Sequence, residues 1–151
     1  MYVGPAPHLV RAWKERGLRR LGSLAAELIA ERLLPPAADV ITYIAPDPIR
    51  QLTRSRHPAE SLAMELSRMW GVPDETLLTR ARSTVRQASL PRERRQANAR
   101  GSFRARGAVP PRVVLVDDVY TTGATASAAA GALRAAGAGT VEVVTFARAV
   151  R

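Results

Sequence analysis

The sequence of 151 residues has no cysteine, which excludes a disulfide framework and any thiolate zinc site. It has no apolar run long enough to span a bilayer, and its N-terminus lacks the hydrophobic core of a signal peptide. The length suits one domain that buries a substantial core. We therefore expect a cytoplasmic protein made of a single domain, residues 1–151, with no membrane span.

Aromatic residues and lysine are also scarce. Aromatics make up 5% of the chain, and Lys14 is the single lysine among 23 basic residues, so the net charge of +10 comes almost entirely from arginine. The guanidinium group makes planar, two-pronged contacts with phosphate. This charge favours anionic small substrates or nucleic acid as partners, and a biased genomic composition would produce the same excess.

The most informative stretch present, Arg112 to Thr125, reads RVVLVDDVYTTGAT. Its four apolar residues, Val113 to Val116, predict a buried parallel strand. Asp117 and Asp118 follow at the carboxyl end, where open α/β sheets bind their ligands. A hydroxyl-rich loop and an alanine-rich helix over 124–136 come next, so the stretch predicts a strand, a loop and a helix.

The chemistry of this stretch suits a sugar phosphate. Two carboxylates offer enough acceptor lone pairs to hold vicinal ribose hydroxyls. Gly123 lets the backbone bend and approach a ligand, and the N–H groups of residues 121–125 with the positive helix end favour an anion. The plainer alternative, two solvated acids before a capped helix, explains less of the string. The predicted site comprises the catalytic acids Asp117 and Asp118 and a 5-phosphate loop of Tyr120, Thr121, Thr122, Gly123, Ala124 and Thr125.

Strand and helix patterns alternate along the chain. Helices are predicted over most of 7–34 and over 59–70 and 124–136; strands are predicted at 39–45, 76–79, 101–106 (an edge strand), 113–116 and 141–146. This order predicts an α/β fold with a mostly parallel sheet flanked by helices. Residues 1–38 would form an N-terminal helical hood over the second substrate, and residues 39–151 the α/β core.

Two further segments carry candidate residues. Arg80 to Arg106 holds nine arginines and one acid, Glu93; it fits either a solvated face or a mobile loop, residues 83–100, that covers a pyrophosphate. Its one aromatic residue, Phe103, does not support a stacking platform for single strands. After the first predicted strand, a basic loop fits either a surface turn or a pyrophosphate site made of Pro46, Asp47, Pro48 and Arg50.

The stretch from Val113 to Thr125 resembles the motif of type I phosphoribosyltransferases that binds 5-phosphoribosyl 1-pyrophosphate (PRPP). Order and spacing from Tyr2 to Arg148 resemble the ComF family, phosphoribosyltransferase-like proteins linked in some bacteria to DNA uptake. The family's loop pattern T-x2-Q-x2-L-x4-R-x2-N-x2-G-x-F is matched by Thr84, Gln87, Leu90, Arg95, Asn98, Gly101 and Phe103.

The chain departs from that family in two places. The Cys-rich zinc ribbon of many members has no counterpart in this sequence. Where the family usually reads R-G-F-N-Q, this chain has Arg54-Ser55-Arg56-His57-Pro58, which alters the pyrophosphate contacts and leaves the PRPP motif intact.

The resemblance implies a Rossmann-like core and the transfer of ribose 5-phosphate from PRPP to an unidentified acceptor, with release of pyrophosphate. It implies Mg²⁺ as cofactor, held mainly through PRPP, with no dedicated metal ligands in the protein. The alternative is a non-catalytic or regulatory PRPP-binding accessory protein of competence that interacts with single-stranded nucleic acid. For the transferase, weak and non-specific binding of single strands is expected, and a homodimer is left open.

Overall fold

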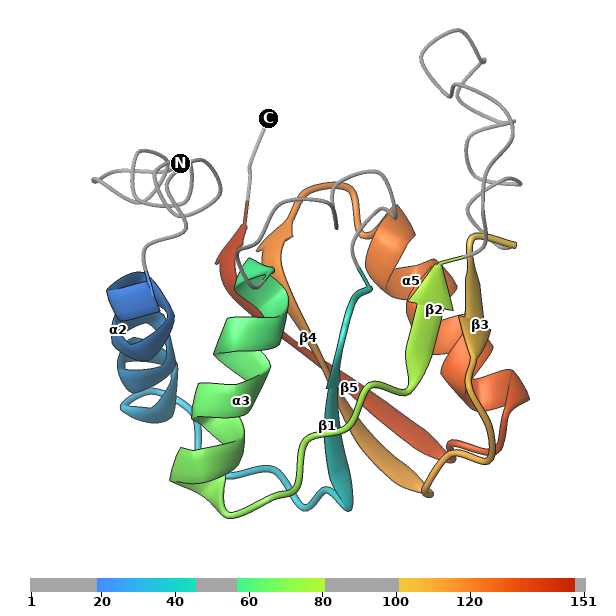
Figure 1. Ribbon diagram of the computed structural model, residues 1–151, viewed down its shortest axis with the longest axis horizontal. Helices are drawn as coiled ribbons and strands as arrows, with labels where there is room; N and C mark the ends of the chain where they lie inside the picture. Colours follow the sequence, from blue (N-terminus) through green and yellow to red (C-terminus); the bar gives the residue numbers. More distant parts are fainter. Residues whose placement is uncertain (1–18, 46–56, 81–100, 149–151) are drawn as a thin grey trace, which may run out of the picture.

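The computed structural model describes residues 19–45, 57–80 and 101–148. Figure 1 shows its elements, three helices and five strands within those ranges. The helices are α2 (Arg19–Ala30), α3 (Pro58–Trp70) and α5 (Ala124–Ala135). The strands are β1 (Val40–Tyr43), β2 (Leu78–Arg80), β3 (Phe103–Ala105), β4 (Arg112–Tyr120) and β5 (Thr140–Arg148).

The main sheet has the order β1-β4-β5, and both pairs of strands are parallel. An isolated parallel bridge between Ile41 and Asp74 adds one more contact on the far side of β1. Parallel neighbours need a crossover, and α5 provides it between β4 and β5. The carboxyl ends of the three strands therefore lie at one edge of the sheet (Figure 1). The predicted mostly parallel α/β sheet is confirmed.

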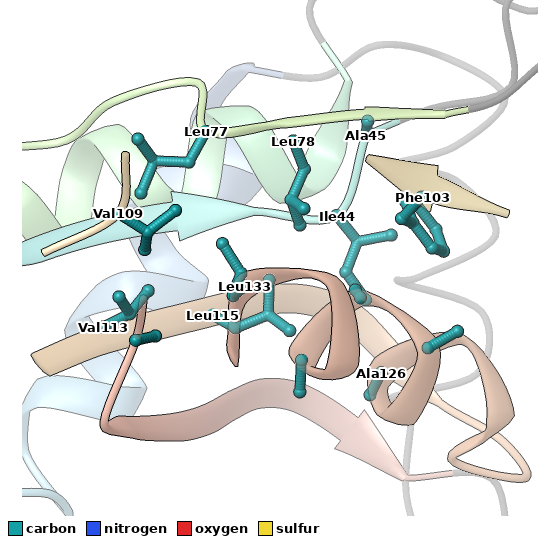
Figure 2. Packing of buried hydrophobic residues seen from close by; sticks show 14 of the residues in the cluster. Ile44, Ala45, Leu77, Leu78, Phe103, Val109, Val113, Leu115, Ala126 and Leu133 are labelled. Carbon is teal, nitrogen blue, oxygen red and sulfur yellow. The ribbon is translucent and has the colours of Figure 1, made fainter. Parts of the chain in front are cut away.

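Helices cover both faces of this sheet because the side chains of β4 alternate. Val113 and Leu115 pack with α5, whereas Val114 and Val116 pack with α2 and α3. Figure 2 shows the α5 side, where Leu133 and Leu115 lie among Ile44, just after β1, Leu78 of β2 and Phe103 of β3. A strand buried on both faces needs a continuous apolar run, which is what Val113 to Val116 supplies.

A second, two-stranded sheet pairs β2 with β3 in antiparallel fashion, Leu78 opposite Ala105. The edge strand predicted over 101–106 is confirmed as β3, while the strand predicted at 76–79 lies at 78–80. The Arg80 guanidinium stacks on the Phe103 ring, 5.1 Å from its centroid. The predicted mobile loop, residues 83–100 with Thr84, Gln87, Arg95 and Asn98, lies outside the described residues.

Helix α3 shows how local sequence sets a boundary. Pro58 opens the helix, where a missing N–H costs nothing, and Gly71 closes it in the left-handed conformation with φ of 67°. Its buried side includes Leu62 and Leu66. The prediction of a helix over 59–70 is therefore confirmed to within one residue.

Strand β4 is longer than predicted. The sequence predicted an end at Val116, yet the strand continues through both acids to Tyr120, because β5 pairs with it as far as Arg148. The prediction of a strand ending before the acid pair was therefore wrong. Residues 1–18 of the predicted hood lie outside the described residues. Among the helices that the structure describes, none combines the length and apolarity that a bilayer crossing requires.

Candidate functional site

The candidate site lies where β4 passes into α5, at the carboxyl edge of the main sheet. The strand ends at Tyr120, three residues bend, and α5 begins at Ala124 with Gly123 as its N-cap. Gly123 has φ of 74°, in the left-handed region that residues with a Cβ rarely adopt. The tight turn expected from Gly123 is therefore present.

The loop presents hydrogen-bond donors and no acidic group. Gly123 has no side chain with which to cap α5, and the first turn of the helix has no acidic residue. One first-turn N–H, that of Ala124, donates to the Thr122 hydroxyl at 3.4 Å. Free N–H groups and the positive end of the helix dipole make such a turn favourable for an anion.

A small cavity joins this loop to the strand. Its volume is about 20 Å³, room for roughly one water molecule. It is lined by five predicted site residues, Asp117, Tyr120, Thr121, Gly123 and Thr125, together with Val119 and Ala126. Three other predicted residues, Asp118, Thr122 and Ala124, do not line it.

The two adjacent acids lie on different faces of the sheet. Because side chains alternate along a strand, Asp117 shares its face with Leu115 and α5, and Asp118 shares its face with Val116 and α3. Asp117 is partly exposed and accepts a hydrogen bond from the Asp118 N–H at 2.9 Å, whereas Asp118 is only 4% exposed. The structure therefore brings Asp117, rather than the pair, to the loop.

Tyr120 connects the loop with the last strand. A Cβ built on Gly123 would lie 2.1 Å from the Tyr120 hydroxyl oxygen, so the tyrosine side chain rests against the glycine. The Arg148 guanidinium lies over the ring of Tyr120, 5.7 Å from its centroid, and the two residues are register partners in β4 and β5. Sequence reasoning placed Tyr120 in the loop and missed Arg148, which no motif spacing connects to it.

A charged pair fastens the opposite edge of the sheet. Asp39 precedes β1 and accepts hydrogen bonds from the Arg112 backbone N–H at 3.0 Å and from its Nε at 3.1 Å, and the two side chains form an ion pair. The side-chain hydrogen bond from Arg112 holds the pKa of Asp39 below its usual value, and the same bond raises the pKa of Arg112. This pair positions β1 against β4, away from the candidate site.

The remaining predicted groups are less well defined. Pro46, Asp47, Pro48 and Arg50, predicted to bind pyrophosphate, lie outside the described residues. Within the described ranges no three His, Cys, Asp or Glu side chains gather as a metal site would require.

Comparison with known proteins identifies one curated relative. Competence protein F of Haemophilus influenzae is 33% identical over 148 residues, a match that covers 91% of this chain and 62% of the relative. The chain thus spans less than two thirds of that protein's length. No protein-family model matches the chain.

Solved structures share the fold. The glutamine PRPP amidotransferase of B. subtilis superposes with a TM-score of 0.59 at 26% identity, over 83% of this chain and 26% of that one. The structure of the allosteric regulatory enzyme of purine biosynthesis superposes with a TM-score of 0.56 at 27% identity, over 83% of this chain and 25% of that one. The purine phosphoribosyltransferase of Pyrococcus horikoshii superposes with a TM-score of 0.52 at 21% identity, over 85% of this chain and 74% of that one.

The chain is similar to Competence protein F over most of its own length, and it has the fold of the type I phosphoribosyltransferases, as the resemblance in its sequence predicted.

Proposed function

We propose that the protein binds PRPP and transfers ribose 5-phosphate to a nucleophile, releasing pyrophosphate. The observation that carries the proposal is that Asp117 and the donor-rich loop line one cavity at the carboxyl edge of the sheet. The Asp117 carboxylate suits the hydroxyls of a ribose, and the neighbouring loop suits its 5-phosphate. The glutamine PRPP amidotransferase, by its name a PRPP enzyme, shares the fold.

In the proposed reaction the bond from ribose C1 to the pyrophosphate oxygen breaks, and the pyrophosphate leaves with the electron pair. The acceptor's lone pair forms the new bond to C1, and its proton passes to solvent or to a base. Positive charge develops on the ribose ring between these events, so a fixed carboxylate such as Asp117 stabilises the transition state. The loop anchors the 5-phosphate and orients C1 for attack.

Mg²⁺ fits this site as an ion held mainly by the oxygens of PRPP, where it would neutralise the leaving pyrophosphate. Asp117, a carboxylate at the candidate site, would be the nearby protein oxygen donor for such an ion.

The first prediction separates the two acids. Asp117→Asn should weaken the binding of PRPP with Mg²⁺, measured by titration calorimetry, by about 1.5–3 kcal/mol, the loss expected for a charge-assisted hydrogen bond. Asp118→Asn should weaken it less, since Asp118 is buried on the other face. Glu142→Gln, an exposed carboxylate of β5, is the matched control. Unchanged affinity in the Asp117→Asn, Asp118→Asn double variant would reject the site.

A second candidate function rests on the name of the curated relative, a competence protein. In that case the cavity is a ligand or regulatory site on a non-catalytic protein that contacts single-stranded nucleic acid. Pyrophosphate release from PRPP, assayed against a panel of purines, pyrimidines and amines, separates the candidates. Release with any acceptor supports the transferase, whereas PRPP binding with no release on any of them supports the accessory protein.

A further inference from the structure

The charge balance of the candidate site is incomplete for a phosphate ligand. The donors of the loop, backbone N–H groups and threonine hydroxyls, are neutral, and Asp117 at the same cavity is negative. A phosphate brought next to a carboxylate is repelled unless a cation lies near both. The site therefore calls for a basic side chain.

Most described arginines near the sheet are engaged elsewhere. Arg112 lies at the opposite edge and pairs with Asp39, Arg134 lies in the last turn of α5, and Arg80 stacks on Phe103. Arg148 differs because it ends β5 at the carboxyl edge, is exposed, and contacts a residue that itself touches the loop. Contacts thus run from Gly123 through Tyr120 to Arg148.

The position of Tyr120 suggests how this cation is delivered. The tyrosine hydroxyl lies directly against Gly123, because a Cβ built on that glycine would be 2.1 Å from the hydroxyl oxygen. A phosphate that comes to the same face of the Gly123 backbone must therefore displace the Tyr120 side chain. That movement also separates the ring from the Arg148 guanidinium, so the side chain can turn toward the phosphate and make a two-pronged contact.

We propose that Arg148 is a further ligand of the 5-phosphate, stored on the ring of Tyr120 until the phosphate displaces that ring from the loop. This inference rests on the proposed function, since it assigns a second group to the same ligand. It adds to the site a residue that the PRPP motif does not contain.

The test measures the dissociation constant of ribose 5-phosphate for the full chain by calorimetry, at several salt concentrations. Arg148→Gln should raise the dissociation constant about tenfold to hundredfold, the span for a lost charge-assisted hydrogen bond, and should flatten its salt dependence. The dissociation constant of Arg148→Lys should lie between those of the wild type and Arg148→Gln, because lysine keeps the charge but lacks the planar guanidinium group. Arg134→Gln, which removes an exposed arginine at the other end of α5, should change neither the dissociation constant nor its salt dependence.

Tyr120 provides the second arm. Tyr120→Leu should lower the dissociation constant about twofold to fivefold, the factor that corresponds to releasing an exposed cation–π contact. Tyr120→Phe should behave like the wild type in its salt dependence, because the ring that stores Arg148 remains. Weaker binding by Tyr120→Leu would overturn the displacement and make the ring part of the ligand's own contacts.

The failures are distinguishable. If the wild type binds ribose 5-phosphate and Arg148→Gln binds it equally well, with the same salt dependence, the role of Arg148 is wrong and the proposed function stands. If the wild type binds neither ribose 5-phosphate nor PRPP, the proposed function fails and this inference fails with it. Thermal unfolding of each variant checks that the exposed substitutions leave the fold intact.

Discussion

At Gly123 the backbone conformation and a neighbouring side chain both restrict the residue type. Its φ of 74° costs an L-residue about 1–2 kcal/mol, and a Cβ there would also meet the Tyr120 hydroxyl. We predict that Gly123→Ala lowers the free energy of unfolding by at least that backbone cost, measured by urea denaturation. It should also weaken the binding of ribose 5-phosphate, because the turn that aims the N–H groups is altered.

Gly71 offers a matched control for Gly123. It has nearly the same conformation, φ of 67°, and nothing lies within 4 Å of a Cβ built on it. Gly71→Ala should therefore show the backbone cost alone and leave ligand binding unchanged. Combining Gly123→Ala with Tyr120→Leu should recover the part of the cost that comes from the clash. Equal destabilisation in Gly123→Ala and Gly71→Ala would show that the tyrosine yields freely.

The sequence was informative about the continuous segment around Gly123 and uninformative about Arg148, for a physical reason. A glycine between a strand and a helix indicates a special turn from local chemistry alone. The stacking of Arg148 on Tyr120 depends on where β5 lies beside β4, which is a matter of tertiary structure. The part of the site made by one continuous segment was predictable, and the part contributed by β5 was not.

Among the elements, β4 is fixed at its amino end by the pair formed by Asp39 and Arg112. The pKa of Asp39 is lowered by that hydrogen bond, so the carboxylate form stabilises the folded state. The stabilisation is complete above the ordinary value of 3.8 and is lost as the pH falls through the lower pKa of the folded state.

We predict that Asp39→Asn lowers the urea midpoint at neutral pH and that the difference from the wild type shrinks as the pH falls below 3.8. Glu142→Gln, which removes an exposed acid from β5, should give a difference that is small throughout. A deficit in Asp39→Asn that persists undiminished at pH 2 would mean that the lost contact is one of packing and not of charge.

Strand β4 also shows how much of a single element could be predicted from the sequence. The apolar run from Val113 to Val116 identified its buried centre, because that run reflects burial on both faces. The strand continues through Asp117 and Asp118 because it pairs with β5. The polarity of these two acids favoured an earlier end of the strand. This difference separates the acids onto two faces, so a four-residue error in length changes the chemistry assigned to the pair.

At the scale of the whole molecule, two apolar clusters on opposite faces of one sheet support the carboxyl edge that carries the candidate site. The α5 cluster and the α2–α3 cluster meet at β4. The odd-numbered apolar residues of β4 pack in the α5 cluster, and the even-numbered ones pack in the α2–α3 cluster. An alanine-rich helix allows close approach on the α5 side, where Ala129 and Leu133 are fully buried. The site thus lies on a rigid strand and helix, which favours a preorganised phosphate loop.

From the net charge of +10 we predict that the protein binds polyanions weakly and without sequence preference. Fluorescence anisotropy with a single-stranded oligonucleotide should show binding at low salt that fades near about 0.15 M, because each neutralised phosphate adds about −0.7 to the log–log slope. Arg104→Gln with Arg106→Gln, both exposed beside β3, should weaken that binding and leave ribose 5-phosphate affinity unchanged. Tight single-strand binding that survives physiological salt, together with no pyrophosphate release on any acceptor, would favour the accessory protein over the transferase.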